Sequence, residues 1–146
     1  LTPEKKTLIA PYGTNLVRAN NKFIRQLTEL DVDFIAYQDE VGVRKTKVDK
    51  TKRLFEKLRV AHDKAGRSEL WADIELFDFE GMVYKSALVP APFERIKKQI
   101  ENAAPYVDKI LSYQYPGLMN PADSSAFAGH GKSVELYEDY KKYIKK

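Results

Sequence analysis

The sequence predicts an α/β fold with a parallel sheet, on the strength of two observations. Short apolar runs typical of strands alternate with segments whose apolar residues recur at helical spacing. Each helical segment is long enough to return the chain across a sheet, as parallel neighbours require. Four such units fill the 146 residues, so we treat residues 1–146 as a single domain.

The four strands are predicted from runs of large apolar residues that end at turn or polar residues. The first run is closed by Gly13, and the second ends in a polar cluster just before Gly42. The third run is the richest in large apolar side chains. The predicted strands are residues 7–12, 33–38, 69–77 and 109–115.

Amphipathic helices are predicted between and after the strands. Thr14 is a plausible cap for the first helix, and Gly66 stands where the second should stop. A polar loop over residues 116–132 leads into a last helix that is rich in tyrosine. The first three helices are predicted over residues 15–30, 48–65 and 93–103.

Two architectures satisfy this alternation. One is a small open doubly wound sheet, with helices on both faces; the other is four consecutive βα units, half of a TIM (β/α)8 barrel. A full barrel needs about 250 residues, so this chain would supply half of one. Half a barrel exposes two sheet edges, which need a partner: a missing N-terminal half or a second copy of the chain.

Composition and charge argue against several kinds of functional site. The chain has no Cys, which excludes disulfides and cysteine-ligated zinc, and its two His residues lack ligand spacing, so no metal or cofactor is expected. The net charge of +4 owes much to four lysines in the last six residues, which argues little for nucleic-acid binding. No apolar run is long enough to span a bilayer, for which about 20 residues are needed.

The third predicted strand carries the most informative polar residues. Period-two alternation places Leu70, Ala72, Ile74 and Leu76 on one face, which suits packing under helices. The opposite face receives two carboxylates between aromatic rings, a costly arrangement unless the charges have a role or a partner. A salt bridge to an inward Lys or Arg is the alternative. The residues of this second face are Trp71, Asp73, Glu75 and Phe77.

Two further carboxylates, Asp39 and Glu40, directly follow the second predicted strand. Neighbouring parallel strands lie about 4.8 Å apart, so a carboxylate from each strand could reach the separation of about 5 to 9 Å used by glycosidase pairs. Either residue could instead cap the loop or helix that follows.

Aromatic and amide side chains at the strand ends suit a carbohydrate site. Flat rings stack on the apolar faces of sugars, and amides such as Gln38 and Gln114 hydrogen-bond sugar hydroxyls. Core packing is the alternative for any single ring. The rings in or next to strands include Tyr12, Tyr37, Trp71, Phe77, Tyr113 and Tyr115.

Three segments of the sequence are distinctive: residues 34–42 (FIAYQDEVG), residues 69–77 (ELWADIELF), and Tyr113-Gln114-Tyr115 with Met119-Asn120-Pro121. In this order they resemble the later strands of a bacterial family frequent in gut Bacteroidetes. The family comprises domains of unknown function described as glycosyl-hydrolase-like TIM barrels. The resemblance spans nearly the whole chain.

The resemblance implies that the chain is the C-terminal half of such a barrel, with its strands in positions five to eight. Glu75 would then stand on the seventh strand, where many retaining barrel glycosidases carry their nucleophile. The usual fourth-strand acid would lie outside this chain. The resemblance alone also implies a periplasmic or extracellular location.

The sequence therefore predicts a glycoside-hydrolase-like domain that binds or cleaves carbohydrate at the carboxyl ends of its strands. Glu75 is the expected nucleophile or charge stabiliser, Asp39 its possible partner, and Asp73 an orienting group. A non-catalytic carbohydrate- or partner-binding domain is the alternative. The expected substrate-binding residues are Tyr12, Gln38, Glu40, Trp71, Tyr113, Gln114 and Asn120.

Overall fold

A computed structural model describes residues 4–13, 20–125 and 131–145. Its centre is a four-stranded sheet in the order β1-β2-β3-β6, and every neighbouring pair of strands is parallel. The predicted α/β class with a parallel sheet is thus confirmed. The strands are β1 (Leu8–Ile9), β2 (Phe34–Gln38), β3 (Glu69–Glu75) and β6 (Lys109–Tyr113).

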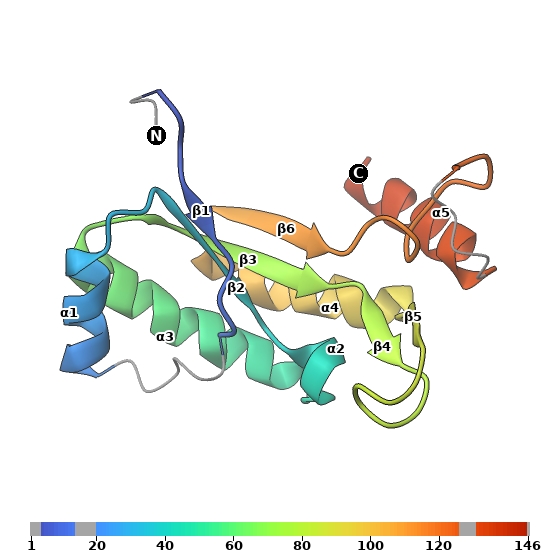
Figure 1. Ribbon diagram of the computed structural model, residues 1–146, viewed down its shortest axis with the longest axis horizontal. Coiled ribbons are helices and arrows are strands. Elements are labelled where there is room, and N and C mark those ends of the chain that lie inside the picture. The colour runs from blue at the N-terminus through green and yellow to red at the C-terminus, as the bar shows by residue number, and fades with distance from the viewer. Residues whose placement is uncertain (1–3, 14–19, 126–130, 146) are drawn as a thin grey trace.

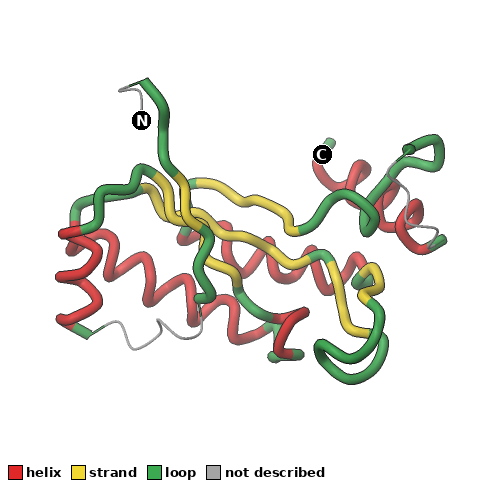
Figure 2. The backbone as a smooth tube through the Cα atoms, in the orientation of Figure 1, coloured by secondary structure: helices red, strands yellow, loops and turns green. Residues whose placement is uncertain are grey.

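Three helices lie along one face of this sheet (Figure 1). They are α1 (Asn21–Glu29), α3 (Asp49–Ala65) and α4 (Phe93–Ala103), each following one of the first three strands of the sheet. Figure 2 shows them below the four strands, and no helix among the described residues covers the opposite face. A doubly wound sheet has helices on both faces, so the arrangement is that of part of a TIM barrel.

The helix-facing side of the sheet forms the main core. Leu70, Ala72, Ile74 and Leu76 are fully buried there, as strand alternation predicts, and they share one cluster with side chains of α3 and α4. Asp73 and Glu75 alternate with these residues along β3. The two carboxyl groups therefore lie on the face that the helices leave uncovered.

Helix boundaries follow from local capping. The Asn20 side chain accepts a hydrogen bond from the Phe23 N–H at 3.1 Å, so α1 begins at Asn21 and not at residue 15 as predicted. Thr14 and residues 15–19 lie outside the described residues. Gly66 ends α3 as predicted: its φ of 64° permits the turn, and its N–H donates to the His62 carbonyl at 2.9 Å.

All four strands of the sheet are shorter than predicted: β1 covers only Leu8–Ile9 of residues 7–12, and β2 begins at Phe34 rather than at residue 33. The Leu76 N–H still bonds the Tyr113 carbonyl of β6, but the Leu76 carbonyl accepts from the Ala91 N–H, so the third strand ends at Glu75. Residues 77–79 then form β4 (Phe77–Phe79), antiparallel to β5 (Leu88–Pro90), so Phe77 belongs to a hairpin and not to β3. The fourth predicted strand ends at Tyr113 rather than at residue 115.

Three shorter or terminal elements complete the fold. A short helix, α2 (Val41–Arg44), follows β2, and a 3-10 turn, η2 (Ala104–Tyr106), follows α4. The last helix, α5 (Lys132–Ile144), packs against β5 and α4. Within the described ranges, no helix is both long and apolar enough to cross a membrane.

Candidate functional site

Strand register brings several of the selected polar residues to one edge of the sheet. Gln38 pairs with Asp73 in the β2-β3 ladder, and Tyr12 forms a parallel bridge to Gln38. Glu75 pairs with Tyr113 one step further along β3 and β6. Residues paired in register point to the same face. These five side chains therefore share the helix-free face at the carboxyl ends of the strands.

Asp73 is almost fully buried, with 6% of its surface exposed. Burial raises the pKa of its carboxyl from 3.8 to about 6, because desolvation penalises the charged form. A hydrogen bond with Gln38 acts in the opposite direction, and the charge of Asp39 adds to the increase. At neutral pH most Asp73 side chains are still ionised.

Glu75 is held by the backbone of α2. Its Oε2 atom accepts hydrogen bonds from the Gly42 and Val43 N–H groups, at 2.6 and 2.8 Å. A carboxylate at a helix N-terminus satisfies N–H groups that have no partner within the helix. Burial nevertheless dominates and raises the pKa of Glu75 from 4.5 to about 7. Near neutral pH this group therefore exchanges readily between its protonated and ionised forms.

Gly42 is required for the approach of α2 to the strand ends. A Cβ at this position would lie 2.2 Å from the Phe77 carbonyl oxygen and 3.0 Å from Glu75 Oε2. We expect Gly42→Ala to lower the free energy of unfolding by about 1 to 3 kcal/mol, because α2 would have to move away from the Phe77 backbone to make room for the methyl group. Gly131→Ala is the matched control, since its Cβ would meet nothing within 4 Å. Equal denaturation midpoints for the two variants would contradict this placement of α2.

Asp39 lies on the other side of the sheet from Asp73. Its Oδ2 atom accepts hydrogen bonds from Thr51 of α3 at 2.9 Å and from Gln99 of α4 at 2.8 Å. Its Oδ1 atom is buried without a hydrogen-bond partner among the described residues, and burial raises the pKa of the carboxyl. The structure thus ties Asp39 to the helices and does not bring it onto the face that carries Glu75.

Arg95 of α4 is a residue that the sequence pattern did not reveal. Its Nη2 atom donates to the carbonyls of Glu75 and Phe77, at 2.9 and 2.8 Å, so it fixes the backbone where β3 gives way to β4. Its Nε atom lies 3.8 Å from Asp78 Oδ2. Burial lowers the pKa of the guanidinium, and the charges of Asp78, Asp39 and Glu75 oppose that change. Arg95 is therefore the cation beneath the end of the sheet that carries Asp73 and Glu75, which we call the acidic edge.

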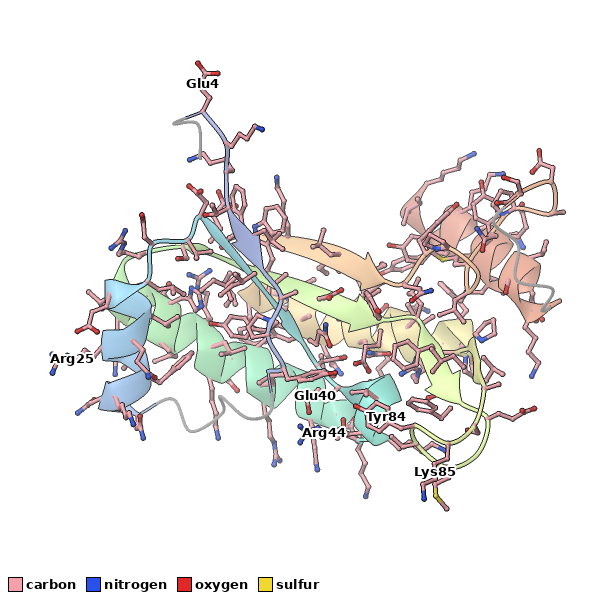
Figure 3. All side chains as sticks on the ribbon, in the orientation of Figure 1. Glu4, Arg25, Glu40, Arg44, Tyr84 and Lys85 are labelled. Carbon is pink, nitrogen blue, oxygen red and sulfur yellow. The ribbon has the colours of Figure 1, made fainter. Side chains whose placement is uncertain are left out.

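Glu40 and Arg44 form an ion pair beside this edge, as Figure 3 shows together with Tyr84. Glu40 is fully buried in a left-handed conformation with φ 59°, and its Oε2 lies 2.6 Å from Arg44 Nε. The Arg44 guanidinium lies over the Tyr12 ring, 5.9 Å from its centroid. A hydrogen bond with Tyr84 raises the pKa of the Tyr12 hydroxyl. The β4-β5 connection thus supplies a rim residue, Tyr84, that lies far from Tyr12 in sequence.

Neither Arg44 nor Tyr84 was selected from the sequence. Arg44 belongs to a basic run that looks like the exposed start of a helix, and only the position of Glu40 after β2 hints at its partner. Tyr84 sits in a segment without clear periodicity. Its role follows from the hairpin, which residue spacing alone does not predict.

Three other selected residues have contacts of their own. Trp71 occupies the amino-terminal half of β3, stacked on Phe34 at 4.5 Å between ring centroids, and its Nε1 donates to Glu69. Gln114 is half-buried and donates to the Pro116 carbonyl at 3.2 Å. Asn120 is buried in the following loop, where it accepts a hydrogen bond from the Gly117 N–H. The structure therefore does not gather Asn120 with Asp73, whereas Trp71 precedes Asp73 on the same face of β3.

A hollow of about 650 Å³ lies at the opposite end of the sheet, where the strands begin. Its lining includes Asp33, Arg59 and Asp108, and none of the selected site residues. In barrels that end serves stability, whereas the carboxyl ends of the strands carry the chemistry. No cluster of three or more His, Asp or Glu in the described part of the chain is arranged to hold a metal ion.

Comparison with solved structures shows what class of fold this geometry belongs to. The chain is similar to a protein from Bacteroides thetaiotaomicron VPI-5482 whose crystal structure is titled that of a putative alpha-L-fucosidase. The TM-score is 0.65 at 25% sequence identity, over 86% of this chain and 35% of the other. The chain thus spans about a third of that protein's length. Its fold is glycoside-hydrolase-like.

Residues 1–125 match the model of a protein family described as "Domain of unknown function (DUF4434)". The chain belongs to this family. No curated protein matches the chain. The predicted resemblance to a family of domains of unknown function with a glycoside-hydrolase-like fold is therefore confirmed at that level.

Proposed function

We propose that the chain is part of a glycoside-hydrolase-like barrel that binds carbohydrate at the carboxyl ends of β2, β3 and β6. One observation carries the proposal: Asp73 and Glu75, two buried carboxyl groups with raised pKa, share one face of one strand at that edge. The similarity to a structure titled as a putative alpha-L-fucosidase supports a sugar as the ligand.

The pKa values of the two carboxyl groups indicate different roles for them. Glu75, with a pKa of about 7, keeps a proton that it can give to a leaving-group oxygen. Asp73, with a pKa of about 6, is mostly ionised at neutral pH and can act as base or charge stabiliser. The two residues occupy alternate positions of one strand, with their Cα atoms about 7 Å apart. The higher pKa of Glu75 favours this residue as proton donor rather than nucleophile.

The sugar would be held by the neighbouring rings and amide. Tyr12 and Tyr113 are 43% and 47% exposed on the same face, so a pyranose can reach the exposed side of each ring. Gln38, Arg44 and Tyr84 would supply hydrogen bonds to hydroxyl groups. Arg44 and Tyr84 join the site in place of Asn120.

A second candidate is a carbohydrate-binding domain without catalysis. One observation favours it: the Gly42 and Val43 N–H groups both donate hydrogen bonds to Glu75 Oε2. These bonds give the Glu75 carboxylate a structural role, because they fix α2 to the end of β3. In that case Asp73 and the rings would bind a sugar that the chain does not cleave.

Aryl glycosides test the two candidates together. An aryl α-L-fucoside, an aryl β-D-galactoside and an aryl β-D-glucoside would be offered to the chain, with leaving-group release and calorimetric binding both measured. We expect turnover of at least one substrate, and loss of that turnover in Asp73→Asn. Binding without turnover would support the second candidate. Absence of both would contradict the carbohydrate site.

A further inference from the structure

Four buried polar atoms without hydrogen-bond partners belong to three neighbouring residues. In the part of the chain that the structure describes, five buried side-chain nitrogen and oxygen atoms have no such partner. Four of the five are Asp39 Oδ1, Gln99 Oε1, and the Nε and Nη1 atoms of Arg95. Buried polar groups in native proteins are nearly always paired with protein or with ordered water. A concentration of such atoms around three residues therefore points to a bound group.

The three side chains are neighbours in space. Gln99 Nε2 donates to Asp39 Oδ2 at 2.8 Å, and this bond fixes the orientation of the amide because a carboxylate can only accept. Arg95 lies one turn before Gln99 on α4, so the two share one side of the helix. The charges of Arg95 and Asp39 each act on the pKa of the other, which places the two groups within electrostatic reach.

Direct contacts among these side chains do not satisfy the unpartnered atoms. The Glu75 and Phe77 carbonyls hold Arg95 Nη2, at 2.9 and 2.8 Å. The guanidinium cannot turn toward Asp39 without losing these bonds. A proton on Asp39 Oδ1 would serve Gln99 Oε1 but would leave Arg95 Nη1 without an acceptor. One group that accepts from Nη1 and donates to both oxygens satisfies all three atoms.

We propose that a buried water molecule joins these side chains, accepting a hydrogen bond from Arg95 Nη1 and donating to Asp39 Oδ1 and Gln99 Oε1. Buried waters typically make about three hydrogen bonds to groups that otherwise lack partners. A cation here would meet Arg95 and an anion would meet Asp39, so a small neutral ligand fits best. The fourth unpartnered atom, Arg95 Nε, has Asp78 as its ionic partner at 3.8 Å.

The proposed water would tie the end of β2 to the end of β3 through α4. It would join Asp39, which follows β2, to Arg95, whose Nη2 atom bonds the Glu75 carbonyl. Asp39 and Gln99 are 2% and 0% exposed, so the site is closed to bulk solvent. The inference does not rest on the carbohydrate site, because Asp39 bonds the helices and not the helix-free face.

A high-resolution crystal structure of this chain tests the proposal directly. We expect the oxygen of one water molecule about 2.7 to 3.2 Å from Arg95 Nη1, Asp39 Oδ1 and Gln99 Oε1. A direct hydrogen bond between Arg95 Nη1 and Asp39 Oδ1 would overturn the proposal, because the two atoms would then need no bridge. A gap between the three atoms that holds no electron density would overturn it as well.

Oxygen-17 relaxation dispersion tests the proposal in solution, because it counts water molecules that stay bound for longer than the protein takes to tumble. It detects the water oxygen, so the hydroxyl proton of Thr51, which also bonds Asp39, does not contribute. Gln99→Met keeps a similar side-chain length but removes the Oε1 acceptor. This variant should hold one long-lived water fewer than the parent chain. Equal counts in the two proteins would contradict the proposed site.

Gln26→Met is the matched control. Gln26 is an exposed residue of α1, so its variant should hold as many long-lived waters as the parent chain. Circular dichroism would verify that both variants are folded. If Gln99→Met does not fold, the crystal structure of the parent chain decides.

Discussion

Turnover of a glycoside is expected to fall by about 10² to 10⁴-fold in Glu75→Gln, which is the range for loss of a general acid or base. Glutamine keeps an oxygen that can accept the Gly42 and Val43 N–H bonds, but it cannot give up a proton. The variant should therefore fold normally while losing the chemical step. Initial rates at saturating substrate measure the effect.

Glu69→Gln is the control for this variant. Glu69 lies on the same strand, is exposed, and contacts Trp71 rather than the acidic edge. Its variant should keep full activity. Unchanged turnover in Glu75→Gln would remove Glu75 from the mechanism and leave it only as the anchor of α2.

Glu75→Gln should also change how the free energy of unfolding depends on pH. Because burial raises the pKa of Glu75 from 4.5 to about 7, the folded state binds the proton more tightly than the unfolded state. The stabilisation from this group is complete below pH 4.5 and is lost as the pH rises through about 7. It amounts to about 3 kcal/mol at most.

Urea denaturation at a series of pH values tests this effect. Asp73 titrates in a similar window, so the difference between the parent chain and Glu75→Gln is the quantity that isolates Glu75. We expect that difference to grow in favour of the variant between pH 4.5 and about 7. A difference that stays constant over this window would contradict the raised pKa.

Arg95→Met should be the most destabilising of these changes, lowering the free energy of unfolding by about 3 to 5 kcal/mol. The substitution strips the Glu75 and Phe77 carbonyls of a shared donor and leaves Asp39 without its nearby cation. The loss of that positive charge should also raise the pKa of Glu75 further, since Arg95 now lowers it.

Lys98→Met provides a matched control on the same helix. Lys98 is exposed and pairs with Asp49 at 2.8 Å, and exposed pairs contribute less than about 1 kcal/mol. Chemical denaturation of the two variants should separate them clearly. Similar losses in both would show that Arg95 is not the cation that holds the end of β3.

The faces of the sheet could be predicted from the sequence because strand alternation is a local pattern. Leu70, Ile74 and Leu76 had to pack under helices, and Asp73 and Glu75 then had to face the other way. The stop of α3 at Gly66 was equally local, since it depends on one residue with positive φ. These features needed no knowledge of distant contacts.

The surroundings of the carboxylates could not be predicted in this way. Asp39 follows the last residue of β2, where alternation no longer applies, and its side is set by Thr51 and Gln99 from distant helices. The helix α2 has four residues, too few to show a helical period. Arg95 lies on an ordinary amphipathic helix, and its role appears only with the carbonyls that it meets.

Amide NMR during titration with a saccharide tests the carbohydrate site most directly. The Gly42 and Val43 N–H groups bond Glu75, and Gln38 pairs with Asp73, so these three amides should shift as the sugar binds. Amides lining the hollow at the other end of the sheet, such as those of Gly66 and Ser68, should stay unchanged. Shifts confined to Gly66 and Ser68, or no shifts at a saturating sugar concentration, would contradict the account.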